Sequence, residues 1–192
     1  MDIKETERAI KKHEKLSLPW YIRLIDCAEI QVDEILLDVG CGGCLLSTLK
    51  RRKFRIVGLD NDQEFIDLAR YRAKDRDGVF LVKGDAFVTP FPNNFFDAVI
   101  ACAFPHDTSG FTNVLIDEMA RVLKPGKKLA IVEDVIVRTG RSGMIHSRLK
   151  KLGLDADINK EFWIVHARKP ESLTVLPGLP PRDIWDDEDY PK

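Results

Sequence analysis

The sequence has little that would tie the chain to a membrane, a secretory route or a nucleic acid. No apolar run approaches the roughly 20 residues that a membrane-spanning helix needs. Residues 1–15 carry charges throughout, unlike the apolar centre of a secretory signal. The formal net charge is −1, so net charge gives no indication of a nucleic-acid partner. We therefore expect a cytoplasmic protein with no membrane segment.

Cysteine is also scarce. The four cysteines, Cys27, Cys41, Cys44 and Cys102, do not resemble the framework of a disulfide-rich secreted domain, so we expect reduced thiols. Two of them form a Cys-x-x-Cys pair inside the stretch DVGCGGC (38–44). Such a pair is either a redox or metal site, or two small residues in a turn with another purpose. A closed zinc site would need further ligands, and none are paired nearby, so no metal is predicted.

What the sequence does contain is an alternation of short apolar runs and helical patterns. Continuous apolar, β-branched runs are typical of strands buried on both faces. Their alternation with helices predicts an α/β fold with a doubly wound, mostly parallel sheet and helices on both of its faces. The expected strands are residues 34–39, 54–60, 79–85, 96–103, 127–134, 157–161 and 162–170.

Helical patterns lie before and between these runs. We expect helices at residues 16–30, 45–53, 111–126 and 142–153, and another that follows the second strand. Asn61, with Glu64 three residues later, predicts a capping box at the start of that last helix. Residues 171–192 contain four prolines and an acidic run, which indicates a draped or disordered extension.

The glycines of DVGCGGC follow a strand and precede a helical pattern, which is where glycines serve ligand binding. Gly40 and Gly42 permit a tight turn and close approach of a ligand to the backbone. Asp60 ends the second strand, where a carboxylate can accept hydrogen bonds from ribose hydroxyls. These features predict a nucleoside cofactor. The dinucleotide pattern would require glycine at position 45, where this chain has Leu45.

An ordered set of motifs adds a family resemblance over roughly residues 32–170. The stretches are ILLDVGCGG, VGLDND, GDAF followed by FPNNFFDAVIACAF, and RVLKPGKKLAIVE. This set resembles the class I S-adenosylmethionine-dependent methyltransferases. The resemblance implies a Rossmann-like sheet of seven strands with the last strand antiparallel, S-adenosylmethionine as the cofactor, and transfer of a methyl group to an acceptor. The acceptor is unidentified; a small molecule is favoured over a macromolecule.

The resemblance also implies which residues contact the cofactor. The last glycine of the family's D-x-G-x-G-x-G loop is Cys44 here, a departure that concerns local packing. The implied contacts are Asp38, Gly40, Cys41 and Gly42 at the methionine end, Asp60 at the ribose, Asn61, Asp85 and Ala86 at the adenine, and Ala101 and Cys102 near the sulfonium.

Methyl transfer from a sulfonium depends mainly on alignment and exclusion of water. If the acceptor loses a proton, the candidates are His106 as general base or acceptor contact, and Asp107 beside it; either residue can instead be a polar loop residue or a helix cap. Trp20 and Tyr21 belong to an N-terminal segment that either covers the active site or simply packs on the sheet.

The domain organisation that follows is an N-terminal helical cap or lid at 1–31, a cofactor-binding domain at 32–170 and a tail at 171–192. Two alternatives stay open. One is an oxidoreductase using a nicotinamide dinucleotide, because the same fold supports both functions. The other is a regulatory subunit that binds S-adenosylmethionine without catalysis. The sequence does not define an oligomeric state.

Overall fold

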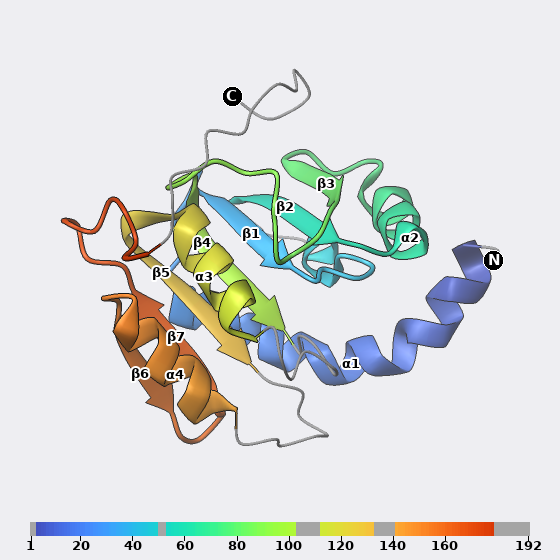
Figure 1. The fold of residues 1–192 in the computed structure, drawn as a ribbon. Coiled ribbons are helices and arrows are strands. Elements are labelled where there is room, and N and C mark those ends of the chain that lie inside the picture. The colour runs from blue at the N-terminus through green and yellow to red at the C-terminus, as the bar shows by residue number, and fades with distance from the viewer. Residues whose placement is uncertain (1–2, 50–52, 103–111, 133–140, 179–192) are drawn as a thin grey trace.

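The structure is a computed structural model, and it describes residues 3–49, 53–102, 112–132 and 141–178. Within these residues the chain forms a sheet of seven strands in the order β3-β2-β1-β4-β5-β7-β6 (Figure 1). Strands β1 to β5 pair in parallel, whereas β7 is antiparallel to both β5 and β6. The predicted fold class, with its antiparallel last strand, is therefore confirmed. The strands are β1 Ile35–Val39, β2 Arg55–Asp60, β3 Val79–Lys83, β4 Phe96–Cys102, β5 Leu123–Val132, β6 Asp155–Asn159 and β7 Ile164–Arg168.

Helices cover both faces of the sheet, as the alternating pattern predicted. Helices α1 (Ile3–Ala28) and α2 (Gln63–Ala73) lie on one face, and α3 (Thr112–Val122) and α4 (Ser142–Lys151) lie on the other (Figure 1). None of the helices in the described part of the chain is long and apolar enough to cross a membrane.

Two apolar cores hold the layers together. The core on the α3 and α4 face includes Leu115 and Leu149, and the core on the α1 and α2 face includes Tyr21, Leu24 and Ile66. Burial of apolar surface on both sides explains why the central strands are continuous apolar runs rather than alternating ones. Strand β1 is the clearest case, because all five of its residues are buried.

The first helix after the glycine turn is much shorter than predicted. In place of a helix over 45–53, the structure has a 3₁₀ helix, η1, at Leu45–Thr48. The Ser47 and Thr48 hydroxyls donate to the carbonyls of Cys44 and Leu45, both at 2.7 Å. Such local side-chain bonds compete with regular helix hydrogen bonding.

The cap of α2 also differs from the prediction. Asp62, not Asn61, is the N-cap residue, and its carboxylate accepts from the Glu64 amide at 2.8 Å. The N-cap therefore lies one residue later than predicted, and the Asn61 side chain does not cap α2.

The start of β5 differs too. The strand begins at Leu123 rather than at residue 127, because Leu123 pairs with Phe96 before a register shift.

A buried lysine fixes the amino-terminal edge of the sheet. Lys169 is 1% exposed, and its ammonium donates to Asn94 Oδ1 at 2.7 Å and to the carbonyls of Leu123 and Ala120 at 2.8 and 2.9 Å. Burial and the nearby Arg121 guanidinium lower the pKa of Lys169 to about 8. This edge is therefore stabilised by polar contacts, and it lies opposite the edge that carries the cofactor motif.

Candidate functional site

The turn after β1 alternates left-handed and ordinary backbone conformations. Gly40, Gly42 and Cys44 have φ values of 69°, 51° and 47°. Glycine adopts such values without steric cost, whereas a residue with a Cβ atom is strained there by about 1–2 kcal/mol. Cys44 thus occupies a position whose backbone suits glycine, so the departure from the family pattern concerns the backbone as well as the packing.

The turn is bonded to the carboxyl end of the neighbouring strand β2. The amides of Gly40 and Cys41 both donate to the Leu59 carbonyl, at 2.8 and 3.0 Å. The Gly42 amide donates to Asp60 Oδ2 at 2.8 Å. A hypothetical Cβ atom on Gly42 would have no heavy atom within 4 Å. The turn is therefore held in place while open space remains beside Gly42.

Asp38 is a fully buried carboxylate in the middle of the sheet. It pairs in register with Gly58 on one side and Ile100 on the other, and it is 0% exposed. Among the described residues, neither of its side-chain oxygens has a hydrogen-bond partner. Burial raises the pKa of Asp38 well above its ordinary value, with smaller contributions from Cys44 and Asp60. An unpartnered buried carboxylate is costly, and it suits a site that receives a cationic or hydrogen-bonding ligand.

Asp60 is already bonded to the protein but keeps acceptor capacity. Its Oδ1 accepts from the Asp62 amide at 3.0 Å, and its Oδ2 accepts from Gly42. A carboxylate offers about four acceptor positions, so about two stay available. Asn61, next to Asp60, is exposed.

The turn after β3 brings Asp85 and Ala86 to the same end of the sheet. Lys83 pairs with Asp60, and the Gly84 amide donates to the Asp60 carbonyl at 2.9 Å. The Asp85 carboxylate is exposed and accepts from the Phe87 amide at 2.8 Å, while Ala86 is half-buried. This geometry brings together predicted residues from β1, β2 and β3.

The end of β4 lies on the other side of β1. Ala101 pairs with Val39 and is fully buried, and Cys102 follows it at 8% exposure. Ala101 belongs to the core under α3 and α4, whereas Cys102 belongs to the core under α1 and α2. The structure therefore directs the two residues to opposite faces of the sheet.

The two predicted catalytic residues, His106 and Asp107, lie outside the described residues, so their roles stay predictions.

Tyr21 of α1 joins this site from the N-terminal segment. It is 6% exposed and shares an apolar cluster with Cys41, Cys44 and Cys102. Burial raises the pKa of the Tyr21 phenol well above its usual range, and the charge of Asp38 acts in the same direction. The sequence singled out Tyr21 only as part of a cap; its proximity to Asp38 depends on how α1 packs.

The Cys-x-x-Cys pair is part of the packing beneath the glycine turn. A Cβ atom on Gly58 of β2 would lie 2.8 Å from Cys41 Sγ, so Cys41 fills the space that this glycine leaves. The bond with Cys44 and burial raise the pKa of the Cys41 thiol, whereas redox and metal-binding cysteines need an accessible thiolate. Neither cysteine forms a disulfide, and no group of three or more potential metal ligands occurs among the described side chains. The arrangement favours a structural role for the pair.

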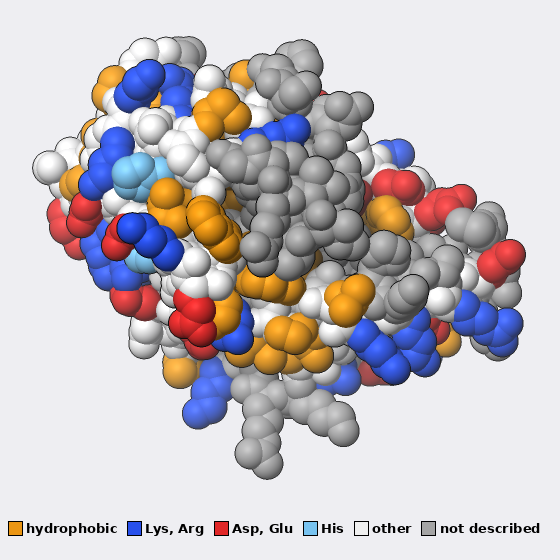
Figure 2. Space-filling model, turned by 90° about the horizontal axis from the view of Figure 1, so that it is seen from below, with side chains coloured by type: hydrophobic (Ala, Val, Ile, Leu, Met, Phe, Trp, Pro, Cys, Tyr) orange, Lys and Arg blue, Asp and Glu red, His pale blue; other side chains and the backbone are white. Residues whose placement is uncertain are grey.

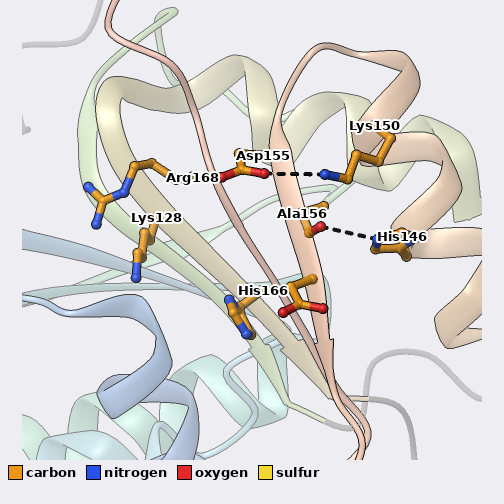
Figure 3. A pocket seen from close by; sticks show the side chains of 8 residues that line it. Lys128, His146, Lys150, Asp155, Ala156, His166 and Arg168 are labelled. Atoms are coloured by element: carbon orange, nitrogen blue, oxygen red, sulfur yellow. Dashed lines mark hydrogen bonds and ion pairs between the residues drawn. The ribbon is translucent and has the colours of Figure 1, made fainter.

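A separate cavity of 520 Å³ lies at the β6 edge of the sheet (Figure 3). There His146 bonds the Ala156 carbonyl at 3.1 Å, and Lys150 contacts Asp155 at 3.2 Å. The Asp157 carboxylate accepts from the Ile158 amide at 2.7 Å. These bonds satisfy groups of an edge strand and discourage its pairing with other strands. None of the predicted cofactor residues lines this cavity.

The family comparison agrees with this geometry. The protein family described as "Methyltransferase domain" matches residues 37–131, which include the second half of β1, all of β2, β3 and β4, and nearly all of β5. The chain belongs to the class I S-adenosylmethionine-dependent methyltransferase family. The match begins one residue before Asp38 and ends within β5, so it covers the buried carboxylate and the glycine turn.

Curated relatives of this methyltransferase domain act on different molecules. The demethylmenaquinone methyltransferase of Listeria welshimeri is 31% identical over 125 residues, which are 62% of this chain and 52% of the relative. The sterol 24-C-methyltransferase of Kluyveromyces lactis is 32% identical over 170 residues, 84% of this chain and 45% of the relative. The chain thus spans about half the length of these relatives.

Solved structures share the fold. The TehB-like S-adenosylmethionine-dependent methyltransferase of Corynebacterium glutamicum superposes with a TM-score of 0.62 at 18% identity. The alignment covers 88% of this chain and 100% of that one. At this identity the likeness concerns the fold alone.

Proposed function

We propose that this chain binds S-adenosylmethionine at the carboxyl ends of β1, β2 and β4 and transfers its methyl group to a small apolar acceptor. The sulfonium of the donor would activate the methyl group: the acceptor atom would attack the methyl carbon in line, the carbon–sulfur bond would break, and S-adenosylhomocysteine would leave. The protein then has to hold the donor, align the acceptor and exclude water. No large inserted domain for recognition of a macromolecule interrupts the described part of the fold.

The observation that carries this proposal is the unpartnered carboxylate of Asp38. The methionine end of the donor bears an ammonium group, which is a suitable partner for a buried carboxylate beside an open glycine turn. Pairing with this ammonium would offset the desolvation cost of the buried Asp38 carboxylate. A nicotinamide dinucleotide offers no comparable ammonium, so Asp38 favours the adenosyl donor.

The other predicted contacts fit the nucleoside part of the donor. The acceptor positions left on Asp60 match two ribose hydroxyls. Asn61 and Asp85 offer polar side chains next to Asp60, where an adenine ring would lie. Ala86 follows Asp85 in the same turn and is half-buried.

Helix α1 would exclude water from the reacting groups. Tyr21 lies buried between the helix and the glycine turn, and its phenol lies near Asp38. A methyl transfer that does not require deprotonation of the acceptor could proceed on this alignment alone. If a proton must leave the acceptor, His106 and Asp107 remain the predicted residues for accepting it.

An apolar acceptor is supported by the side chains at the same end of the sheet. The β6–β7 turn carries Phe162, whose ring lies 6.2 Å from that of Trp20 in an edge-to-face arrangement. Next to it, Trp163 is 49% exposed, and Met144 at the start of α4 is 42% exposed. Figure 2 shows hydrophobic side chains across the middle of the end toward which β4 and β5 point. The two relatives named for quinone and sterol substrates agree with such an acceptor.

Binding calorimetry with S-adenosylmethionine, S-adenosylhomocysteine and NAD tests the donor site. We expect both adenosyl ligands to bind, NAD not to bind, and Asp38→Asn to weaken the adenosyl ligands by at least tenfold. Asp67→Asn, on the exposed face of α2, is the matched control and should bind as the wild type does. Binding of NAD alone would refute the proposal and favour an oxidoreductase.

Turnover separates an enzyme from a binding subunit. Transfer of a labelled methyl group to a panel of quinones and sterols, compared with hydrophilic amines, should label an apolar acceptor. Tight binding of the donor without label in any acceptor would favour a non-catalytic subunit.

A further inference from the structure

Arg72 of α2 contacts the glycine turn from outside the predicted site. Its Nη1 donates to the Gly43 carbonyl at 3.2 Å, and its side chain is only 8% exposed. Gly43 lies between two residues in the left-handed conformation, Gly42 and Cys44. A fixed carbonyl at this point restricts both neighbouring peptide units, because the backbone has only two soft torsions per residue.

With this contact, one β–α unit holds four consecutive residues of the turn. Leu59 accepts from Gly40 and Cys41, and Asp60 accepts from Gly42. Arg72, two turns into the helix that follows, bonds Gly43. The shape of this turn therefore depends on β2 and α2 in addition to its own bond from the Cys44 amide to the Cys41 carbonyl at 2.8 Å.

The same guanidinium reaches the N-terminal helix. Arg72 Nη2 lies 3.6 Å from Glu7 Oε1 of α1, whose side chain is 41% exposed. The pair borders a cavity of 250 Å³ between α1, η1 and α2, which Lys11 and Arg76 also line. Among the residues that the structure describes, the ion pair is a direct link between this part of α1 and the residue that bonds the turn.

We propose that Arg72 is a positioning residue of the donor site, which holds Gly43 for the methionine end of the donor and transmits the docking of α1 through Glu7. The inference rests on the proposed function, because it concerns how the donor is bound. Arg72 need not touch the donor; it acts through the Gly43 carbonyl. Lysine cannot replace it fully, because one ammonium does not provide the forked donors that face both Gly43 and Glu7.

The test compares two ligands that differ only in the amino-acid part. S-adenosylhomocysteine has the methionine-like end, whereas 5′-methylthioadenosine lacks it. Calorimetry on Arg72→Gln should show about tenfold weaker S-adenosylhomocysteine binding and nearly unchanged methylthioadenosine binding. Glu7→Gln should weaken S-adenosylhomocysteine by about threefold, as expected for an exposed ion pair. Arg70→Gln, on the exposed side of the same helix, is the control and should match the wild type.

The double variant of Arg72 and Glu7 tests the link to α1. If Glu7 acts through Arg72, the double variant should bind no more weakly than Arg72→Gln alone, and Arg72→Lys should recover part of the affinity. Equal weakening of both ligands by Arg72→Gln, or wild-type affinity for S-adenosylhomocysteine, would overturn the proposal. Additive losses in the double variant would overturn the link to Glu7. If the wild type binds neither ligand, the proposed function itself fails, which is a different result.

Discussion

Replacing Asp38 by asparagine should make the ligand-free protein more stable while it weakens donor binding. The carboxylate is fully buried between β2 and β4 and has no hydrogen-bond partner among the described residues. An unsatisfied buried polar group typically costs about 1–3 kcal/mol. Asparagine has nearly the same shape, and its amide is also a buried polar group, but it carries no charge. Because an unpaired buried charge costs more than a neutral polar group, we expect the unfolding free energy of the ligand-free variant to rise by about 1–3 kcal/mol at neutral pH.

The gain in unfolding free energy from Asp38→Asn should depend on pH. Burial raises the folded-state pKa of Asp38 above its unfolded value, so the folded protein keeps this proton when the unfolded chain has lost it. The protonated form stabilises the wild type at low pH, and this advantage is lost as the pH rises from about 4 toward the folded pKa. The difference between Asp38→Asn and the wild type should therefore be small at about pH 5 and larger at about pH 8.

Urea unfolding of both proteins at the two pH values measures this difference. The matched control is Asp97→Asn, because Asp97 accepts from the Ile35 amide at 3.0 Å and from Lys124 at 2.8 Å. That substitution removes a satisfied carboxylate and should destabilise the protein. Destabilisation by Asp38→Asn of the same size as in the control would show that Asp38 has a partner within the protein, and the argument for a ligand ammonium would fail.

Three further predictions concern packing and charge. Cys44→Gly should be more stable than Cys44→Ala by about 1 kcal/mol, because position 44 is left-handed; thermal unfolding measures this. Gly58→Ala should cost about 1–3 kcal/mol in urea unfolding, and Cys41→Ala in the same chain should recover part of it, since the new Cβ would lie 2.8 Å from Cys41 Sγ. Relative to Lys169→Met, the wild type should gain about 2 kcal/mol of stability between about pH 7.5 and 9.5, because the pKa of Lys169 is lowered to about 8 and its charged form is disfavoured in the folded state.

Each of these has a contradicting result. Equal stability of the two variants at position 44 would mean that the turn adopts another conformation. If the stability losses of Gly58→Ala and Cys41→Ala simply add in the double variant, the Cβ atom at position 58 does not clash with the Cys41 side chain. A stability difference at position 169 that does not change with pH would show that the lysine keeps an ordinary pKa.

The sequence determined the order of strands and helices and most of the residues that meet at the candidate site. Apolar runs such as the one in β1 follow from burial on both faces, which composition and pattern record directly. The glycine turn and Asp60 were also predictable, because their spacing follows from a strand–turn–helix connection. The pattern was less informative about side chains that compete with the backbone for hydrogen bonds. The hydroxyls of Ser47 and Thr48 bond nearby carbonyls, and the predicted helix is reduced to η1.

Only the tertiary structure decided what each of these residues can do. Among the described residues it left the Asp38 carboxylate without a hydrogen-bond partner, it filled the space at Gly58 with Cys41, and it brought Arg72 to the Gly43 carbonyl 29 positions earlier in the chain. Such contacts join segments that are far apart in sequence, and their energies depend on burial and on the distances between particular atoms. A linear pattern encodes which face a residue occupies, but the partner it meets there is fixed only when the layers pack together.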